Sequence, residues 1–342
     1  MRITRAVFIL AGMVLAGAAV ARDQLPIFDV HLHADRADAQ GPPPLAMCTP
    51  ISMPAWDAAE PYADTFMRAL KNPGCPDPVW SPLTDDEVRD RTIAAMERHN
   101  VVGVLSGSPE RVAQWRAAAP GRFYAGLGFN VAVSEMTPED IRKLHAEGRL
   151  DAIAEVTNQY SGVPPNDPRM ESYWSVAEEL DIPVGIHIGP GPPGVIYLGS
   201  ENYRARLHSP LMLEEVLVRH PKLRVYVMHA GFPMLDDTLA LLYAHPQVYV
   251  GVGVIVYTQP REAFYRYLEA LVDAGFGKRI LFGSDQMVWP ETIERSIDVI
   301  EQAPFLSPAQ KRDILYDNAA RFFRLSDDTI DRHKSLATQT GR

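Results

Sequence analysis

FDVHLH, residues 28–33, closes a short apolar run near the start of the chain. Successive side chains of a β-strand point to opposite faces, so His31 and His33 would lie on the same face of such a strand. Two imidazole rings on one face can bind a metal ion together. The alternative is a strand end whose two histidines face water. The stretch therefore predicts a buried strand. The two histidines at its end either contribute to a metal site or face water.

The segment before this strand has the pattern of a secretory signal peptide over residues 1–21. Arg2 and Arg5 supply the positive start, residues 6–18 form an apolar run, and residues 19–21 (Ala-Val-Ala) offer a small-x-small cleavage site. The alternative is a buried N-terminal helix. The apolar run is short for a membrane span, so we expect no integral membrane segment after cleavage. We therefore expect a periplasmic or secreted protein.

Composition and charge limit the classes of partner. The chain has 342 residues, 46% hydrophobic and 22% charged, with a formal net charge of −10. Loss of Arg2 and Arg5 with the signal peptide would make the mature chain more negative still, at −12. This balance argues against nucleic acid as a partner, but it does not choose among small-molecule substrates, since a local basic pocket can lie in an acidic protein. A homo-oligomer is compatible with the sequence, which does not set the number of subunits.

The chain has two cysteines, Cys48 and Cys75, and both lie in a Pro-rich stretch from residue 41 to residue 82. In an oxidising compartment two cysteines within one irregular segment are expected to form a disulfide. The alternative is a metal site, but neither cysteine has a CxxC partner or a nearby histidine. We expect the stretch to have little regular structure of its own.

Downstream of this stretch, short apolar runs alternate with amphipathic helical patterns. Eight runs have the character of strands: residues 27–31, 101–106, 123–129, 152–156, 183–187, 224–229, 248–254 and 279–283. Helical patterns lie between them, for example at residues 84–99, 137–148, 171–180, 211–220 and 261–274. Thr84 and Glu87 have the spacing of a capping box at the start of the first of these.

Strand and helix alternation over one long chain predicts parallel strands joined by crossover helices. Eight such units are typical of a closed (β/α)8 TIM barrel, here a single α/β domain over residues 22–325 with a Pro-rich insertion after the first strand. Residues 326–342 would form a C-terminal tail. An open doubly wound sheet is the competing fold, but no G-x-G-x-x-G motif follows any predicted strand.

Polar side chains occur where five of the predicted strands end. They are His33, Glu155, His187, His229 and Asp285. In a barrel the C-terminal ends of the strands meet on one face, so these side chains would surround one centre. Each has an ordinary structural alternative, such as a helix cap or a buried hydrogen bond. A set of nitrogen and oxygen ligands suits Zn²⁺ or a similar first-row divalent ion.

The remaining histidines have other expected roles. Those near predicted helix ends are expected to be solvated or to cap a helix, and they are His99, His145, His220, His245 and His333. His208 lies in the loop after the fifth strand, and its role is left open.

At the strand ends the chain resembles the amidohydrolase superfamily, specifically the amidohydrolase-related group called amidohydrolase 2. The motifs that carry this resemblance are DVHLH (29–33), GIHIG (185–189), HAGFP (229–233), FGSD (282–285) and, more weakly, NAARFF (318–323). The resemblance covers residues 27–323. It implies a metal-dependent hydrolase in which His31, His33, His187 and Asp285 bind a metal. His229 would either bind a second metal or polarise the substrate.

One position departs from the common pattern of this superfamily. Many relatives carry a carbamylated lysine on the fourth strand, which bridges two metals, whereas this chain has Glu155. A glutamate can bridge two ions or lie behind the ligands. The resemblance therefore implies one or two divalent ions, with Zn²⁺ as the first choice.

The expected chemistry is hydrolysis of a small carboxylate-bearing lactone, ester or amide. A divalent ion makes water more acidic and polarises a carbonyl group, while Asp285 would transfer the proton and His229 would support the oxyanion. Arg204 and Arg206, in the loop of residues 189–209, are candidates to bind the substrate carboxylate, unless that loop is a solvated surface.

Aromatic residues near the same face could line the site, and Tyr160 is the candidate for substrate binding; ordinary packing is the alternative role. Two other functions stay open. The first is metal-dependent non-oxidative decarboxylation, which the resemblance also allows. The second is a non-catalytic periplasmic binding or metal-holding barrel.

Overall fold

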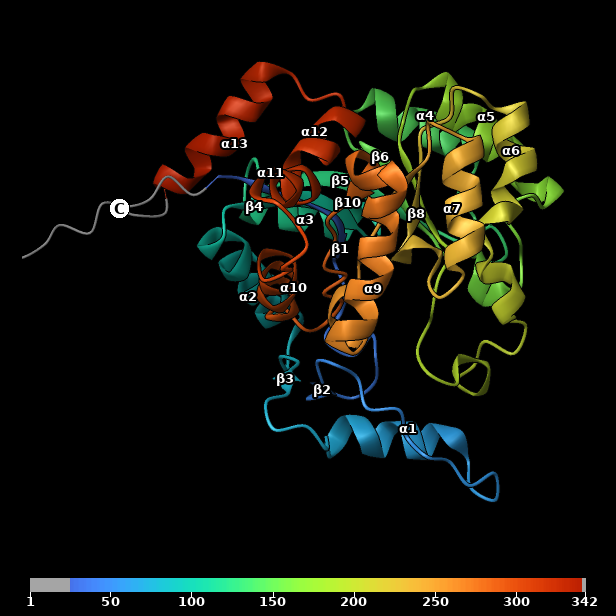
Figure 1. Cartoon of the computed structure of the whole chain (residues 1–342), viewed down its shortest axis with the longest axis vertical. Helices are drawn as coiled ribbons and strands as arrows, with labels where there is room; N and C mark the ends of the chain where they lie inside the picture. Colours follow the sequence, from blue (N-terminus) through green and yellow to red (C-terminus); the bar gives the residue numbers. More distant parts are fainter. Residues whose placement is uncertain (1–24, 340–342) are drawn as a thin grey trace, which may run out of the picture.

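The structure is a computed structural model that describes residues 25–339, so the predicted signal peptide at residues 1–21 lies outside the described residues. Eight parallel strands form one sheet that curves into a nearly closed barrel (Figure 1). In sheet order the strands are β1 (Ile27–His33), β4 (Val101–Ser106), β5 (Phe123–Phe129), β6 (Ala152–Val156), β7 (Val184–His187), β8 (Val225–Met228), β9 (Tyr249–Gly251) and β10 (Ile280–Leu281). Each predicted strand is present, and the predicted (β/α)8 TIM barrel is confirmed.

Backbone hydrogen bonds join the first strand to the segment that follows the last one. The Val30 N–H donates to the carbonyl oxygen of Phe282 at 3.0 Å, and the Asp285 N–H donates to the carbonyl oxygen of His31 at 2.8 Å. Apolar side chains such as that of Phe28 fill the interior of the barrel. Asp285 is therefore held beside β1 by the same bonds that close the barrel.

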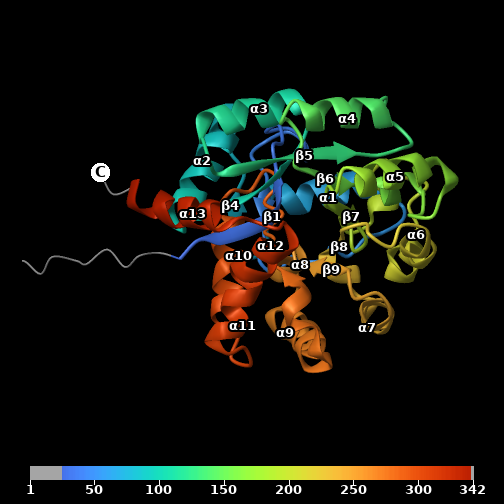
Figure 2. The ribbon, with the colours of Figure 1, turned by 90° about the horizontal axis from the view of Figure 1, so that it is seen from above.

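Helices surround the strands on the outside of the barrel (Figure 2). They are α2 (Asp85–Arg98), α3 (Pro109–Ala118), α4 (Pro138–Ala146), α5 (Glu171–Glu179), α6 (Glu214–Arg219), α7 (Leu235–Ala244), α8 (Ile255–Thr258), α9 (Arg261–Leu271), α10 (Thr292–Glu301) and α11 (Pro308–Arg312), while α12 (Asn318–Phe322) lies at one end of the barrel (Figure 1). Thr84 and Glu87 form the predicted capping box of α2. The α6 helix is shorter than the predicted segment at 211–220, because Pro210–Leu213 forms a 3-10 turn.

The Pro-rich stretch of residues 41–82 has more regular structure than the sequence predicts, and we call it the roof segment. It contains the antiparallel pair β2 (Ala46–Met47) and β3 (Val79–Trp80) and the helix α1 (Tyr62–Lys71). The predicted disulfide between Cys48 and Cys75 is present. Figure 1 shows β2, α1 and β3 together at one end of the barrel, opposite α12.

The end of the chain, predicted as a C-terminal tail at 326–342, contains a helix. Residues Asp327–Gln339 form the helix α13, which lies at the same end of the barrel as α12 (Figure 1). His333, predicted to be solvated or capping, is instead buried, and its ring nitrogens lie 3.1 Å from the Tyr124 hydroxyl and 2.9 Å from the Tyr316 hydroxyl. The prediction for His333 failed because this packing depends on contacts distant in sequence. None of the helices within residues 25–339 is both long and apolar enough to span a bilayer.

Candidate metal centre

The six predicted ligand residues meet at the end of the barrel that faces the roof segment. They are His31 and His33 on β1, Glu155 on β6, His187 at the end of β7, His229 after β8 and Asp285 after β10. All are buried except His33, which is partly exposed. They come together because the C-terminal ends of parallel barrel strands point to one face.

One group of ligand atoms lies around Asp285. Its Oδ1 atom is 3.0 Å from His33 Nε2 and 3.5 Å from His31 Nε2. Glu155 Oε2 lies 3.6 Å from His31 Nε2 and 3.8 Å from His33 Nε2. These four side chains therefore present two nitrogen and two oxygen atoms to one small volume.

A second group lies on the other side of Glu155. Its Oε1 atom is 2.6 Å from His187 Nδ1 and 3.4 Å from His229 Nε2. The two oxygens of Glu155 thus face different pairs of histidines. This is the arrangement that a carboxylate bridging two ions requires.

Several buried ring nitrogens of this cluster have no hydrogen-bond partner among the described residues. Both ring nitrogens of His31 and the Nε2 atom of His187 are buried with no hydrogen-bond partner among residues 25–339. A buried polar atom without a partner destabilises a fold unless a ligand satisfies it. Imidazole and carboxylate donors at these separations fit a first-row divalent ion. The residues present therefore fit the metal that the sequence predicts.

The hydrogen bond of His229 sets its tautomer. Its Nδ1 atom lies 2.9 Å from the carbonyl oxygen of Gly253, which can only accept, so Nδ1 carries the proton. In the neutral ring, Nε2 then presents a lone pair toward Glu155 and His187. This favours a ligand role for His229 over the role of a hydrogen-bond donor to substrate.

In the metal-free cluster, burial and neighbouring charged groups shift the pKa values of Glu155 and His33 in opposite directions. Burial raises the pKa of Glu155, but its electrostatic interactions with His31 and then His187 outweigh burial and hold that pKa well below its usual value. Burial lowers the pKa of His33, but its hydrogen bond to Asp285 and that carboxylate's charge raise it to about 10. The cluster therefore keeps its carboxylates ionised, and His33 must release a proton before it can bind a metal.

Two supporting residues were not identified from the sequence. Asp29 is fully buried and accepts hydrogen bonds from the backbone N–H groups of His31 at 2.9 Å and Ser284 at 3.1 Å. Gln286 holds the backbone of His33 from both sides, accepting at 3.0 Å and donating at 2.7 Å. Asp29 lies within the quoted FDVHLH stretch, but nothing in the sequence distinguishes Gln286 as a support for β1.

A chamber of about 620 Å³ opens above the cluster and is covered by the roof segment. His33, Glu155, His187, His229 and Asp285 line it. So does Asp35, a carboxyl group that the sequence analysis did not single out, and burial raises its pKa. The volume suits a small organic molecule.

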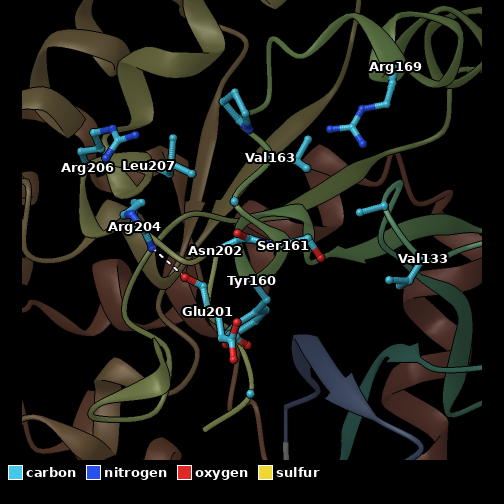
Figure 3. Close-up of a pocket in the computed structure, with 15 residues that line it drawn as sticks. Val133, Tyr160, Ser161, Val163, Arg169, Glu201, Asn202, Arg204, Arg206 and Leu207 are labelled. Atoms are coloured by element: carbon cyan, nitrogen blue, oxygen red, sulfur yellow. Dashed lines mark hydrogen bonds between the residues drawn. The ribbon is translucent and has the colours of Figure 1, made fainter. Parts of the chain in front are cut away.

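Of the three predicted substrate-binding residues, Tyr160 alone lines the chamber. Its ring centroid is 4.7 Å from that of His187. Arg204 and Arg206 line a neighbouring hollow instead, together with Arg169 (Figure 3). The Arg204 guanidinium donates to the backbone carbonyl of Glu201 at 2.8 Å, drawn as a dashed line in Figure 3. The structure therefore does not bring the two predicted arginines to the metal cluster.

Comparisons with known proteins identify the family and the fold. Residues 28–325 match a family model described as amidohydrolase. The fluG protein of Emericella nidulans is 20% identical over 246 residues, which are 63% of this chain and 28% of that protein, so the chain spans under a third of its curated relative.

Two solved structures share the fold. A probable 2-pyrone-4,6-dicarboxylic acid hydrolase from Acinetobacter baumannii has a TM-score of 0.56 at 16% identity, covering 87% of this chain and 99% of that chain. The 5-carboxyvanillate decarboxylase of Sphingomonas paucimobilis has a TM-score of 0.55 at 14% identity, covering 88% of this chain and 100% of that chain. At such identities the likeness extends to the fold alone.

Proposed function

We propose that this chain, which belongs to the amidohydrolase family, is a metal-dependent hydrolase of a carboxylic ester, lactone or amide. The observation that carries the proposal is the position of Glu155 between two pairs of histidines, with one oxygen facing each pair. Such a site can hold two divalent ions, for which Zn²⁺ is our first choice. A bridged pair of ions is suited to the activation of water.

The six ligand residues form two sets, one for each ion. His31, His33 and Asp285 would hold one ion and His187 and His229 a second, with Glu155 shared. A bound divalent ion lowers the pKa of water and polarises a carbonyl group.

Asp285 would accept the proton of the attacking water and return it to the leaving oxygen or nitrogen. Water thereby adds to the carbonyl carbon, the bond to the leaving group breaks, and the products are an acid and an alcohol or amine. Tyr160 would orient the substrate as a neutral phenol, since burial raises its pKa well above the usual value. The carboxylate on the substrate that the sequence predicts is not part of this proposal, because Arg204 and Arg206 lie outside the chamber.

Decarboxylation is the second candidate. It is supported by the group of His31, His33 and Asp285, which is sufficient for one ion, and by the fold shared with 5-carboxyvanillate decarboxylase.

The proposal also includes export to the periplasm, supported by the pattern of residues 1–21 and by the Cys48–Cys75 disulfide.

The test is a turnover screen of protein reconstituted with Zn²⁺ or Mn²⁺. The screen measures release of p-nitrophenol from esters, ring opening of lactones, cleavage of anilides and CO₂ release from aromatic acids. Hydrolysis that requires the metal supports the proposal. CO₂ release without hydrolysis would replace it by the second candidate, and metal-loaded protein with no turnover in any assay would favour a non-catalytic barrel.

A further inference from the structure

The chamber above the cluster lacks the cations that a carboxylate-bearing substrate needs. Among residues 25–339, no arginine or lysine lines it. The carboxyl groups that line it are Asp35, Glu155 and Asp285. Ionised Glu155 and Asp285 neutralise the charge of one divalent ion, so a net positive charge in the site would come from a second ion. That charge lies on the floor, where the reacting carbonyl binds, and not on the walls.

The walls and roof of the chamber are mostly apolar. The roof segment contributes Met47, Met53, Phe66 and Met67, while Met287 and Trp289 come from the loop after β10. Methionine side chains are flexible and polarisable, so they adapt to apolar groups of different shapes. The roof residues that line the chamber therefore offer dispersion contacts and no charged group.

The backbone of the adjacent wall is also poor in hydrogen-bond donors. Pro190, Pro192 and Pro193 follow β7 and line the chamber, and proline has no N–H group. The N–H of Gly191, which lies among them, already donates to the Tyr203 hydroxyl at 3.2 Å. Neither side chains nor backbone on this wall can replace the hydration of an anionic group.

The neighbouring arginines do not compensate for this. The hollow that Arg204 and Arg206 line shares Tyr160 and Ser200 with the chamber (Figure 3). Arg204 already donates to the backbone carbonyl of Tyr203 at 2.7 Å in addition to its bond with Glu201. A carboxylate bound against the walls or roof of the chamber would thus be desolvated without a cationic partner, which is strongly unfavourable.

We infer that the substrate is an uncharged ester, lactone or amide whose apolar part, an aryl or branched alkyl group, packs under the methionines and Phe66 of the roof. This inference rests on the proposed hydrolysis. Neutral hydrogen-bonding groups on the walls, Gln40, Thr258 and Gln259, suit uncharged polar atoms of such a substrate. The carboxylic acid product would ionise inside a chamber lined by carboxylates, which favours its release.

The experiment compares two esters of equal length, p-nitrophenyl hexanoate and mono-p-nitrophenyl adipate, which differ in a terminal carboxylate. We expect kcat/KM of the metal-loaded wild type to be about 100-fold higher for the hexanoate, because the carboxylate must be buried unpaired. Met67→Arg should reduce this preference at least several-fold, whereas Val218→Arg, which adds the same charge at an exposed site on α6, should leave it unchanged.

Equal or better turnover of the adipate ester by the wild type would overturn the inference while leaving the proposed hydrolysis intact. A selective loss of adipate turnover in Arg204→Ala, Arg206→Ala would also overturn it, by placing the carboxylate in the neighbouring hollow.

Calorimetric titration provides a readout that does not need turnover. The neutral ligand 4-isopropylacetophenone should bind at least tenfold more tightly than 4-acetylbenzenesulfonate, for the same reason. This result in a protein without hydrolase activity would reject the proposed function but uphold the neutral, apolar preference of the chamber. Tighter binding of the sulfonate would contradict that preference.

Discussion

Replacing Asp285 by asparagine separates proton transfer from metal binding. Oδ1 of Asp285 belongs to the ligand group at 3.0 Å from His33 Nε2, whereas Oδ2 lies 3.9 Å from His229 Nδ1. An asparagine can keep its oxygen on the His33 side, which places the NH₂ group where Oδ2 was. That NH₂ group cannot accept a proton from water, so the ligand is kept and the base is lost.

General base catalysis contributes about 10²- to 10⁴-fold, so kcat of Asp285→Asn should fall by that factor, or about 2.7–5.4 kcal/mol of barrier. Metal content should change far less than kcat. The assay is steady-state hydrolysis of p-nitrophenyl hexanoate, with the metal in the same sample measured by mass spectrometry.

Asp35→Asn makes the same chemical change in the same chamber but outside the two ligand groups, and it serves as the control. Its kcat should stay within about tenfold of the wild type, because it removes no assigned acid or base. A fully metallated Asp285→Asn enzyme with near-normal kcat would refute the reasoning. Collapse in Asp35→Asn alone would transfer the role of base to that residue.

Three further predictions concern the metal count, the roof and the base of the barrel. Glu155→Gln should lower the number of bound ions from two to one in a metal titration, because a neutral amide cannot balance the charge of two neighbouring ions. Saturation of both the wild type and the variant at one ion would exclude a bridging role for Glu155. Tyr62→Phe removes the 2.7 Å hydrogen bond that the roof segment donates to the Pro193 carbonyl. The variant should lose about 1 kcal/mol of unfolding free energy, and its KM should rise. An unchanged KM would show that the roof segment does not position the substrate. Burial, and less strongly Arg332, lowers the pKa of His333 to about 4 in the folded protein. As the pH falls from about 6.5 toward 4, this histidine is protonated in the unfolded chain but not in the folded one, so the folded state loses stability. The stability advantage of the wild type over His333→Gln in urea should therefore shrink by roughly 2 kcal/mol between pH 7.5 and pH 4.5, and a constant difference would show that this histidine does not titrate as described.

The barrel and the location of the six predicted ligand residues could be predicted because both follow from short-range patterns. Parallel strands buried on both faces produce continuous apolar runs, which mark where each strand ends. Once the strands are taken as a closed barrel, their C-terminal ends must meet, so His187 and Asp285 are brought together despite almost a hundred residues between them. The sequence pattern was therefore sufficient to locate the cluster.

The parts that were missed depend on contacts between segments without periodic patterns. Nothing in the roof segment predicts that α1 covers the cluster, and nothing near Arg204 or Arg206 predicts that their loop turns them away from it. The burial of His333 between Tyr124 and Tyr316 likewise requires the docking of α13, which the polar sequence of that helix does not indicate. The general location of the site could thus be predicted, but the chemistry of its walls could not.

The metal content of the His31→Ala, His33→Ala variant tests the central claim most directly. His31 and His33 both belong to the group of ligand atoms around Asp285. The variant and the wild type are reconstituted with Zn²⁺, dialysed and analysed by mass spectrometry, and circular dichroism checks that the variant is folded. We expect the variant to lose the ion held around Asp285, so that it binds one ion fewer than the wild type. A folded double variant that binds as many ions as the wild type would contradict the assignment of this cluster as the metal site.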